Sequence, residues 1–172
     1  MVAPGGATVH VLLSSHRVSV AMGLPGIGSY VRPARSLGLV DTNVLEVDTA
    51  RRRVVDLTGA VRSFCGGHRD GLCNVFVPHA TAGVAIIETG SGSDDDLVDT
   101  LERLLPRDDR YRHAHGSKGH GADHLLPAIV APSVTVPVQD GAPLLGTWQS
   151  VVLVDLNRDN PRRKVRLSFV DG

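Results

Sequence analysis

Histidines are the residues of this chain whose type and spacing most directly suggest chemistry. The sequence has eight of them, and the polar segment YRHAHGSKGHGADH holds four, at positions 113, 115, 120 and 124. A neutral imidazole can bind a metal ion or exchange a proton near pH 7. Because no compact zinc signature such as H-E-x-x-H is present, the spacing leaves two interpretations open. The segment is either part of a site or a loop of solvent-exposed histidines.

A further histidine, His79, ends an apolar run and precedes the small residues 80–83, which allow a ligand to approach the backbone closely. Glu88 ends the next apolar run, GVAII. On strict strand alternation the two positions point to opposite faces, so they share a site only if a bulge or a turn intervenes. A purely structural His79 at the end of a strand is the alternative interpretation.

Two other segments carry polar groups at suggestive positions. The carboxylates of residues 94–96 are explained by the first turn of a helix, whose dipole favours negative charge there, and a Mg²⁺ site is the alternative. The run GTWQ, residues 146–149, combines a glycine with neutral hydrogen-bonding side chains, although it also fits a simple strand start. Neither a glycine-rich nucleotide loop nor a G-x-S-x-G elbow occurs, which argues against nucleotide-dependent phosphoryl transfer and serine-hydrolase chemistry.

Composition places the chain among globular proteins of one domain. It has 172 residues, 42% of them hydrophobic, and a formal net charge of zero, so no overall basic field favours nucleic acid. No apolar run reaches the length of a membrane-spanning helix, and Cys65 and Cys73 suit ordinary thiols of a reducing cytosol. Residues 1–40 lack acidic residues and periodicity, and we expect a mostly disordered extension.

The remaining sequence, 41–172, predicts an α+β domain with a mostly antiparallel sheet. The segments 43–49 and 51–58 are rich in valine and predict a β-hairpin. A helix is expected from Thr58, and leucines on one face predict a second helix at 93–105. Further strands are expected at 72–77, 83–87, 133–138, 146–156 and 164–170. Strands and helices do not alternate strictly, which argues against a parallel fold.

The order of several motifs resembles the YjbQ-like family, whose members are known as secondary thiamine-phosphate synthases. The motifs are HATAGVAIIE, an acidic helix before Pro106, YRH, DHL, SVTVPVQDG, LGTWQ and NPRR, between about Asp41 and Gly172. The resemblance implies an antiparallel sheet bent into a half-barrel or sandwich, with two or three helices, in a homotrimer. The chain departs from the family pattern at Ile87, Ser91 and Asp123, where an amide, an acid and a small residue are usual.

The resemblance also implies a polar pocket with named residues. Its catalytic residues are predicted to be His79, Glu88, His113 and His124. The three histidines of that set are the predicted ligands of a divalent metal, Zn, Mg or Mn. Substrate-binding residues are predicted at Thr81, His120, Gly146, Thr147 and Gln149.

The function implied by the resemblance is a thiamine-phosphate synthase activity, possible as a side activity. It joins a pyrimidinylmethyl diphosphate to a thiazole phosphate and releases pyrophosphate, which requires stabilisation of the leaving group. Metal-dependent hydrolysis and non-catalytic binding of a metal or metabolite are the alternatives. We expect a small phosphorylated metabolite as partner, no nucleic acid, no membrane, and a cytoplasmic location.

Overall fold

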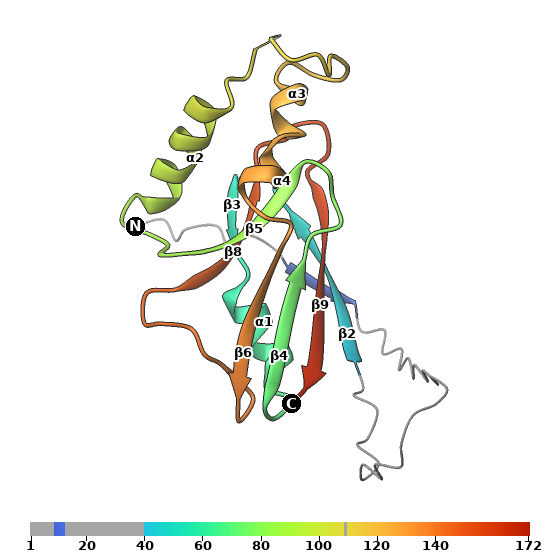
Figure 1. Ribbon diagram of the computed structural model, residues 1–172, viewed down its shortest axis with the longest axis vertical. Helices are drawn as coiled ribbons and strands as arrows, with labels where there is room; N and C mark the ends of the chain where they lie inside the picture. The colour runs from blue at the N-terminus through green and yellow to red at the C-terminus, as the bar shows by residue number, and fades with distance from the viewer. Residues whose placement is uncertain (1–8, 13–39, 109) are drawn as a thin grey trace, which may run out of the picture.

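The computed structural model describes residues 9–12, 40–108 and 110–172, which form two antiparallel sheets and four helices (Figure 1). The larger sheet has the order β1-β2-β9-β4-β6-β7 and the smaller one β3-β8-β5. The strands of the larger sheet are β1 (Val9–Leu12), β2 (Val40–Asp48), β4 (Gly71–Phe76), β6 (Ser133–Gln139), β7 (Ala142–Pro143) and β9 (Arg162–Asp171). Those of the smaller sheet are β3 (Val54–Asp56), β5 (Ala82–Ile87) and β8 (Ser150–Asp155).

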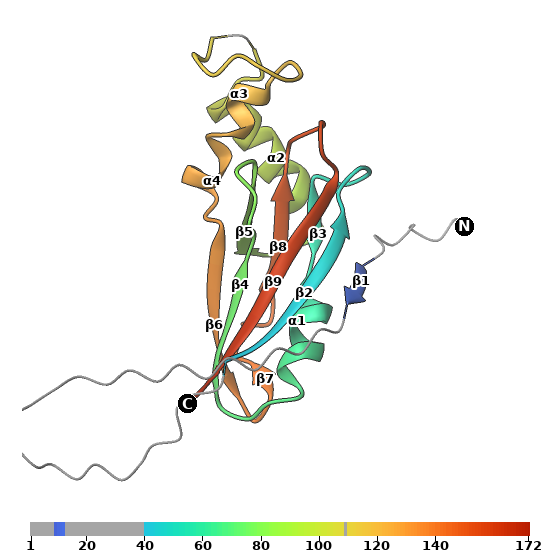
Figure 2. The ribbon, with the colours of Figure 1, turned by 90° about the vertical axis from the view of Figure 1, so that its right-hand side faces the viewer.

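The helices are α1 (Thr58–Cys65), α2 (Ser93–Leu104), α3 (His120–Asp123) and α4 (Leu126–Ile129). The two longer helices, α1 and α2, match the two helices predicted from the sequence, and α3 and α4 are single turns within the segment expected to be a loop. Figure 2 shows α3 beyond the ends of the strands at one end of the molecule, with α4 beside the strand ends below it. The predicted fold class, α+β with a curled antiparallel sheet, is confirmed.

Two expectations about the strands differ from the structure. Residues 43–49 and 51–58 do not form a hairpin, because β2 pairs with β1 and β9 whereas β3 pairs with β8 in the other sheet. The valine-rich pattern indicates strands, but it does not specify their partners. Within the expected extension, the structure describes the strand β1, and the other residues of 1–39 lie outside the described part of the chain.

The strand β8 is buried along almost its whole length because both of its faces are covered. Val151 and Leu153 belong to the core between the two sheets. The alternate residues Val152 and Val154 face a second cluster that includes Leu101 of α2 and Leu126 of α4. The smaller sheet therefore lies between the larger sheet and the helices α2 and α4. An uninterrupted apolar run is the pattern expected of a strand covered on both faces.

The thiols of Cys65 and Cys73 are free and fully buried in the core between the sheets. Burial in these apolar surroundings raises the pKa of the Cys73 thiol. Among the described residues no helix is long and apolar enough to cross a membrane.

A buried ion pair connects the end of β8 to the start of β9. Asp155 accepts hydrogen bonds from Arg163 Nε at 2.6 Å and Nη2 at 2.9 Å, and from Thr49 Oγ1 at 2.7 Å. The side chains of Asp155 and Arg163 are 0% and 2% exposed. The pair therefore joins the two sheets at the end where α3 and α4 lie.

We expect Arg163→Met to destabilise the fold by about 3–5 kcal/mol, because it leaves the Asp155 carboxylate buried without its charged partner. Urea unfolding at neutral pH measures the loss. Arg162→Met is the matched control, since Arg162 is exposed and surface changes stay within about 0.5 kcal/mol. Equal losses of unfolding free energy in the two variants would show that the buried pair does not contribute to stability.

Candidate metal site

Three histidines converge at the end of the molecule where α3 lies. His113 belongs to the loop before α3, while His120 and His124 are four residues apart on that helical turn, a spacing that places two side chains on one helix face. One potential ligand nitrogen from each histidine lies within 4.8 Å of the other two. The Nε2 atoms of His120 and His124 are 3.0 Å apart.

A buried carboxylate holds α3 against the rest of the protein. Asp123 has a fully buried side chain, forms an ion pair with Arg107 and accepts a hydrogen bond from Asn157 Nδ2 at 2.9 Å. Arg107 follows α2, and Asn157 follows β8. Asp123 therefore supplies a polar anchor directly before His124.

A second carboxylate fixes the orientation of His120. Asp159 Oδ2 lies 2.9 Å from His120 Nδ1 and accepts a hydrogen bond from the Ser117 backbone N–H at 3.3 Å. Hydrogen bonding from Ser117, and then from His120, lowers the pKa of the Asp159 carboxyl group. The ionised carboxylate favours the tautomer with its proton on Nδ1, which directs the Nε2 lone pair of His120 at His124, whose Nε2 lies at hydrogen-bonding distance.

The loop before α3 approaches the His120 ring so closely that only glycine fits at position 116. Gly116 has a φ of +77°, and a Cβ atom there would lie 2.8 Å from ring atoms Cγ and Nδ1 of His120. The same Cβ would lie 3.1 Å from Asp159 Oδ2. Gly116 therefore permits both the turn and the contact between His120 and Asp159.

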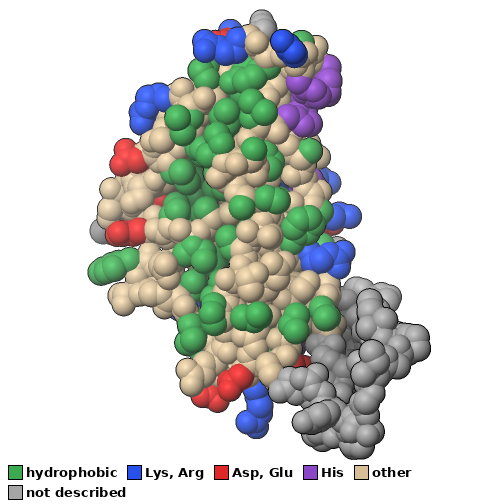
Figure 3. Space-filling model, viewed as in Figure 1, with side chains coloured by type: hydrophobic (Ala, Val, Ile, Leu, Met, Phe, Trp, Pro, Cys, Tyr) green, Lys and Arg blue, Asp and Glu red, His purple; other side chains and the backbone are tan. Residues whose placement is uncertain are grey.

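His113, His115 and His120 line an open pocket of about 270 Å³ that is formed by described residues between 108 and 121. Figure 3 shows histidine side chains gathered at this end of the molecule. Burial, followed by the neighbouring histidines, lowers the pKa of His124, which favours its neutral, metal-binding form. Two imidazole nitrogens bound to one tetrahedral zinc ion lie about 3.3 Å apart. The Nε2 atoms of His120 and His124 are at a hydrogen-bonding distance of 3.0 Å, so a small shift of the two rings would let both nitrogens bind such an ion.

His79 lies outside this group of three. It follows β4, and its Nε2 accepts a hydrogen bond from the Lys164 backbone N–H at 2.8 Å, so that lone pair is already used. Burial, followed by the charge of Arg163, lowers the pKa of His79. Thr81, predicted to bind substrate, is buried just before β5. The cluster thus differs from the predicted ligand set in one member: His120 occupies the place expected for His79.

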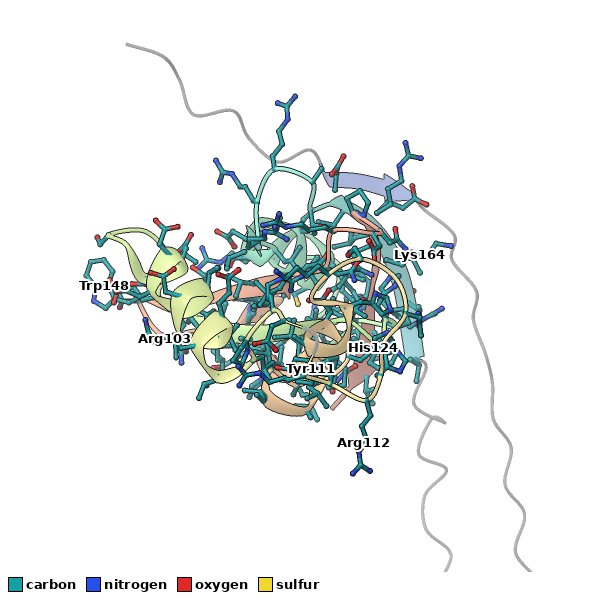
Figure 4. The ribbon with its side chains drawn as sticks, turned by 90° about the horizontal axis from the view of Figure 1, so that it is seen from above. Arg103, Tyr111, Arg112, His124, Trp148 and Lys164 are labelled. Atoms are coloured by element: carbon teal, nitrogen blue, oxygen red, sulfur yellow. The ribbon has the colours of Figure 1, made fainter. Side chains whose placement is uncertain are left out.

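The other predicted site residues lie at the opposite end of the smaller sheet. Glu88 follows β5, whose last residue pairs with Ser150 at the start of β8, and the GTWQ run directly precedes that residue. Asp155, at the other end of β8, is five residues beyond Ser150, and five residues of an extended strand span about 17 Å. Figure 4 shows Trp148 and His124 on opposite sides of the molecule. His79 and Glu88 therefore flank β5 rather than share one pocket.

The residues around Glu88 have local partners. Gly146 N–H donates to Gln149 Oε1 at 2.8 Å, and Thr89 Oγ1 lies 3.1 Å from Ser150 Oγ. Asp94 lies in the first turn of α2 and accepts a hydrogen bond from the Gly90 backbone N–H at 3.0 Å. That contact agrees with the helix-start interpretation of residues 94–96.

Three residues of the histidine end have roles in the structure that the sequence does not predict. Asp159 braces His120, Lys118 lines the pocket, and the ring of His115 lies beside those of His113 and His120. His115 was visible in the histidine-rich segment but had no assigned role. For Asp159 the only signal was the polar turn NRDNPRR, which is far from the histidines in the sequence.

The two antiparallel sheets and the histidine end define a YjbQ-like α+β protein. The family described as UPF0047 protein YjbQ-like matches residues 43–172. This chain belongs to that family.

Its relatives include a UPF0047 protein of Mycobacterium tuberculosis, 84% identical over 133 residues that cover 77% of this chain and 100% of the relative. Another is the UPF0047 protein YugU of Bacillus subtilis, 31% identical over 70% of this chain and 91% of the relative. Among solved structures, a YbjQ-like protein of unknown function from Sulfolobus solfataricus has a TM-score of 0.72 and 25% identity, covering 77% of this chain and 98% of that one. A hypothetical protein from Aeropyrum pernix has a TM-score of 0.69 and 32% identity, covering 76% and 98%.

Gly116→Ala is expected to weaken zinc binding by about 10–100-fold, the usual effect of disturbing a group that orients a ligand, because the new methyl group displaces the His120 ring. Competition with a chromophoric chelator measures the affinity. Gly90→Ala is the matched control, since Gly90 also has a positive φ, +84°, but a Cβ there meets nothing within 4 Å. If both variants bind zinc as the wild type does, the packing of Gly116 against His120 does not matter for the site.

His79 is expected to make the fold less stable as the pH falls. Its folded-state pKa is lowered from 6.5, so the unfolded chain binds the proton more readily, and stability is lost as the pH drops from about 7 toward 5. The free energy of unfolding, measured by urea titration across that range, should fall less in His79→Gln than in the wild type. Arg162→Gln, which removes no group that titrates there, serves as control. An equal pH dependence in wild type and His79→Gln would contradict this assignment.

Proposed function

We propose that this chain is a metal-dependent enzyme acting on a small phosphorylated metabolite, and that His113, His120 and His124 hold the metal. The observation that supports this proposal is the convergence of three imidazole nitrogens within 4.8 Å beside an open pocket. Three protein ligands with a free position are typical of catalytic zinc sites, whereas structural sites have four. An all-imidazole donor set also favours zinc or a similar transition metal over Mg²⁺, which prefers oxygen.

The chain's own residues prepare the site for an anionic substrate. Lys118 lines the pocket with a positive charge. Asp108 is the acidic residue among the described residues that line that pocket, and Arg110 forms hydrogen bonds with both of its carboxylate oxygens. Asp159 is expected to keep the proton of His120 on Nδ1. An ion held by the three histidines would supply Lewis-acid stabilisation of the charge that develops on a phosphate or pyrophosphate leaving group.

The specific reaction that we propose is of the thiamine-phosphate synthase type. The pyrimidinylmethyl carbon is transferred from its diphosphate to a thiazole phosphate, and pyrophosphate leaves. The family resemblance supports this choice, and so does a pocket that joins imidazoles with Lys118. For this reaction Lys118 and an ion held by the histidines would supply the positive charge that stabilises the leaving pyrophosphate.

Metal-dependent hydrolysis of a phosphate or diphosphate is the second candidate. The observation that favours it is the position of the GTWQ residues, which precede the start of β8, whereas the histidine end lies beyond the end of that strand. Among the described residues of one chain, the predicted substrate-binding groups therefore do not all meet at the cluster. A hydrolase needs room for one substrate and water, and it makes fewer demands on the pocket.

The test combines elemental analysis with turnover of the two thiamine precursors. We expect about one zinc-type ion per chain of wild type, and thiamine phosphate formation that is lost with chelator and in His124→Ala. Arg112→Ala is the matched control, because Arg112 is exposed and points away from the other labelled residues (Figure 4). Circular dichroism checks that every variant is folded.

The outcomes separate the candidates. Release of phosphate or pyrophosphate without thiamine phosphate, if it depends on metal and on His124, replaces the transferase by the hydrolase. If the protein binds about one metal ion per chain but catalyses neither reaction, it is a metal-binding protein without these activities. Wild-type protein that binds no more metal than His124→Ala rejects the proposal as a whole.

A further inference from the structure

We propose that His115 is a fourth, displaceable ligand of the metal held by His113, His120 and His124, and that an anionic oxygen of the substrate replaces it. This inference rests on the proposed function, since it concerns the same ion. It assigns a role to the one histidine of the segment 113–124 that is otherwise unexplained.

The ring of His115 lies about as close to the rings of His113 and His120 as the three ligand rings lie to one another, and somewhat farther from that of His124. Its ring centroid is 4.2 Å from that of His113, 4.6 Å from that of His120 and 6.2 Å from that of His124. The corresponding separations among the three are 4.4, 4.7 and 5.7 Å. Two imidazoles bound to one tetrahedral ion through bonds of zinc–nitrogen length have centroids about 5 Å apart. The His115 ring is therefore near enough to the other three that a rotation of its side chain could bring a ring nitrogen to the same ion.

His115 differs from the other three in how firmly it is held. His120 is fixed by Asp159, and His124 follows the helical turn that Asp123 anchors. His115 is exposed, and within the described part of the chain its ring has no recorded hydrogen bond. Its nitrogens also lie outside the group whose atoms are within 4.8 Å of one another. A change of side-chain rotamer, which exposed residues make readily, brings the ring to the ion or takes it away.

The surroundings of His115 favour an anion as its replacement. Lys118 lines the same pocket as His115, and the carboxylate of Asp108, which also lines it, is bound by Arg110. In the exchange the imidazole leaves as a neutral group, and an oxygen of phosphate or pyrophosphate takes the vacated position, with no covalent bond of protein or substrate broken. With His115 bound the site is closed, and without it the site has the open position of a catalytic centre.

Cobalt(II) is the probe, because its visible absorption depends on the number and type of ligands. The full chain is loaded with Co²⁺ as wild type, His115→Ala, His115→Gln and Arg112→Ala, and each spectrum is recorded before and after addition of pyrophosphate. We expect a changed spectrum in both His115 variants and an unchanged one in the Arg112 control. Pyrophosphate should convert the wild-type spectrum into that of His115→Ala with pyrophosphate, since both then have the same ligands.

The affinity for Co²⁺ provides a second readout. The affinity should fall by no more than about tenfold in His115→Ala. It should fall by more than about 100-fold in His120→Ala, because mutating a residue that only orients a metal ligand already lowers metal affinity by about 10–100-fold. Identical cobalt spectra of wild type and both His115 variants would overturn the inference and leave the three-histidine site standing. Changed spectra without a response to pyrophosphate would overturn the displacement. Wild type that binds no Co²⁺ would overturn the inference together with the proposed function.

Discussion

The burial of β8 on both faces is the constraint on which the rest of this structure depends. A strand that is covered on one face exposes its other face to solvent, but both faces of β8 are apolar. The larger sheet covers Val151 and Leu153, and a layer of helices covers Val152 and Val154. Leu101 and Leu126 supply that layer from α2 and α4. The segment between α2 and α4 must then cross the end of the smaller sheet. The position of the histidine-rich loop at that end is therefore fixed by the packing of the two helices.

Buried carboxylates at that end convert the packing into a defined geometry. Asp155 holds Arg163 and Thr49, while Asp123 holds Arg107 and Asn157. Each carboxylate accepts from groups on separate segments, so neither can move without leaving a buried charge unpaired, which is costly. The turn between β8 and β9 is thereby fixed with Asp159 facing His120. The order of the site follows from these ion pairs as much as from the histidines themselves.

The sequence predicts the elements well and their partners poorly, for a physical reason. Apolar periodicity depends on which faces are buried, so it locates α2 and the long strand β9. It does not encode which strand lies beside which, and the expected hairpin of residues 43–58 is in fact split between two sheets. His113 and His124 could be named from the motifs, whereas the pairing of His120 with Asp159 joins residues 39 apart in sequence. Only the closure of the fold brings these two together.

The separation of the two polar ends limits the chemistry that one chain can perform. A transfer between two substrates needs the reacting atoms in contact, and groups on opposite ends of a strand about 17 Å long cannot both touch one bond. Gly146–Gln149 and Glu88 are thus unavailable to a bond that breaks beside His120. The groups of this chain that can act on such a bond lie in the pocket itself, and they include imidazoles, Lys118 and the hydroxyl groups of Tyr111 and Ser117. The ammonium group of Lys118 and these hydrogen-bond donors favour a substrate that is anionic at the breaking bond, and this electrostatic preference is common to the transferase and hydrolase candidates.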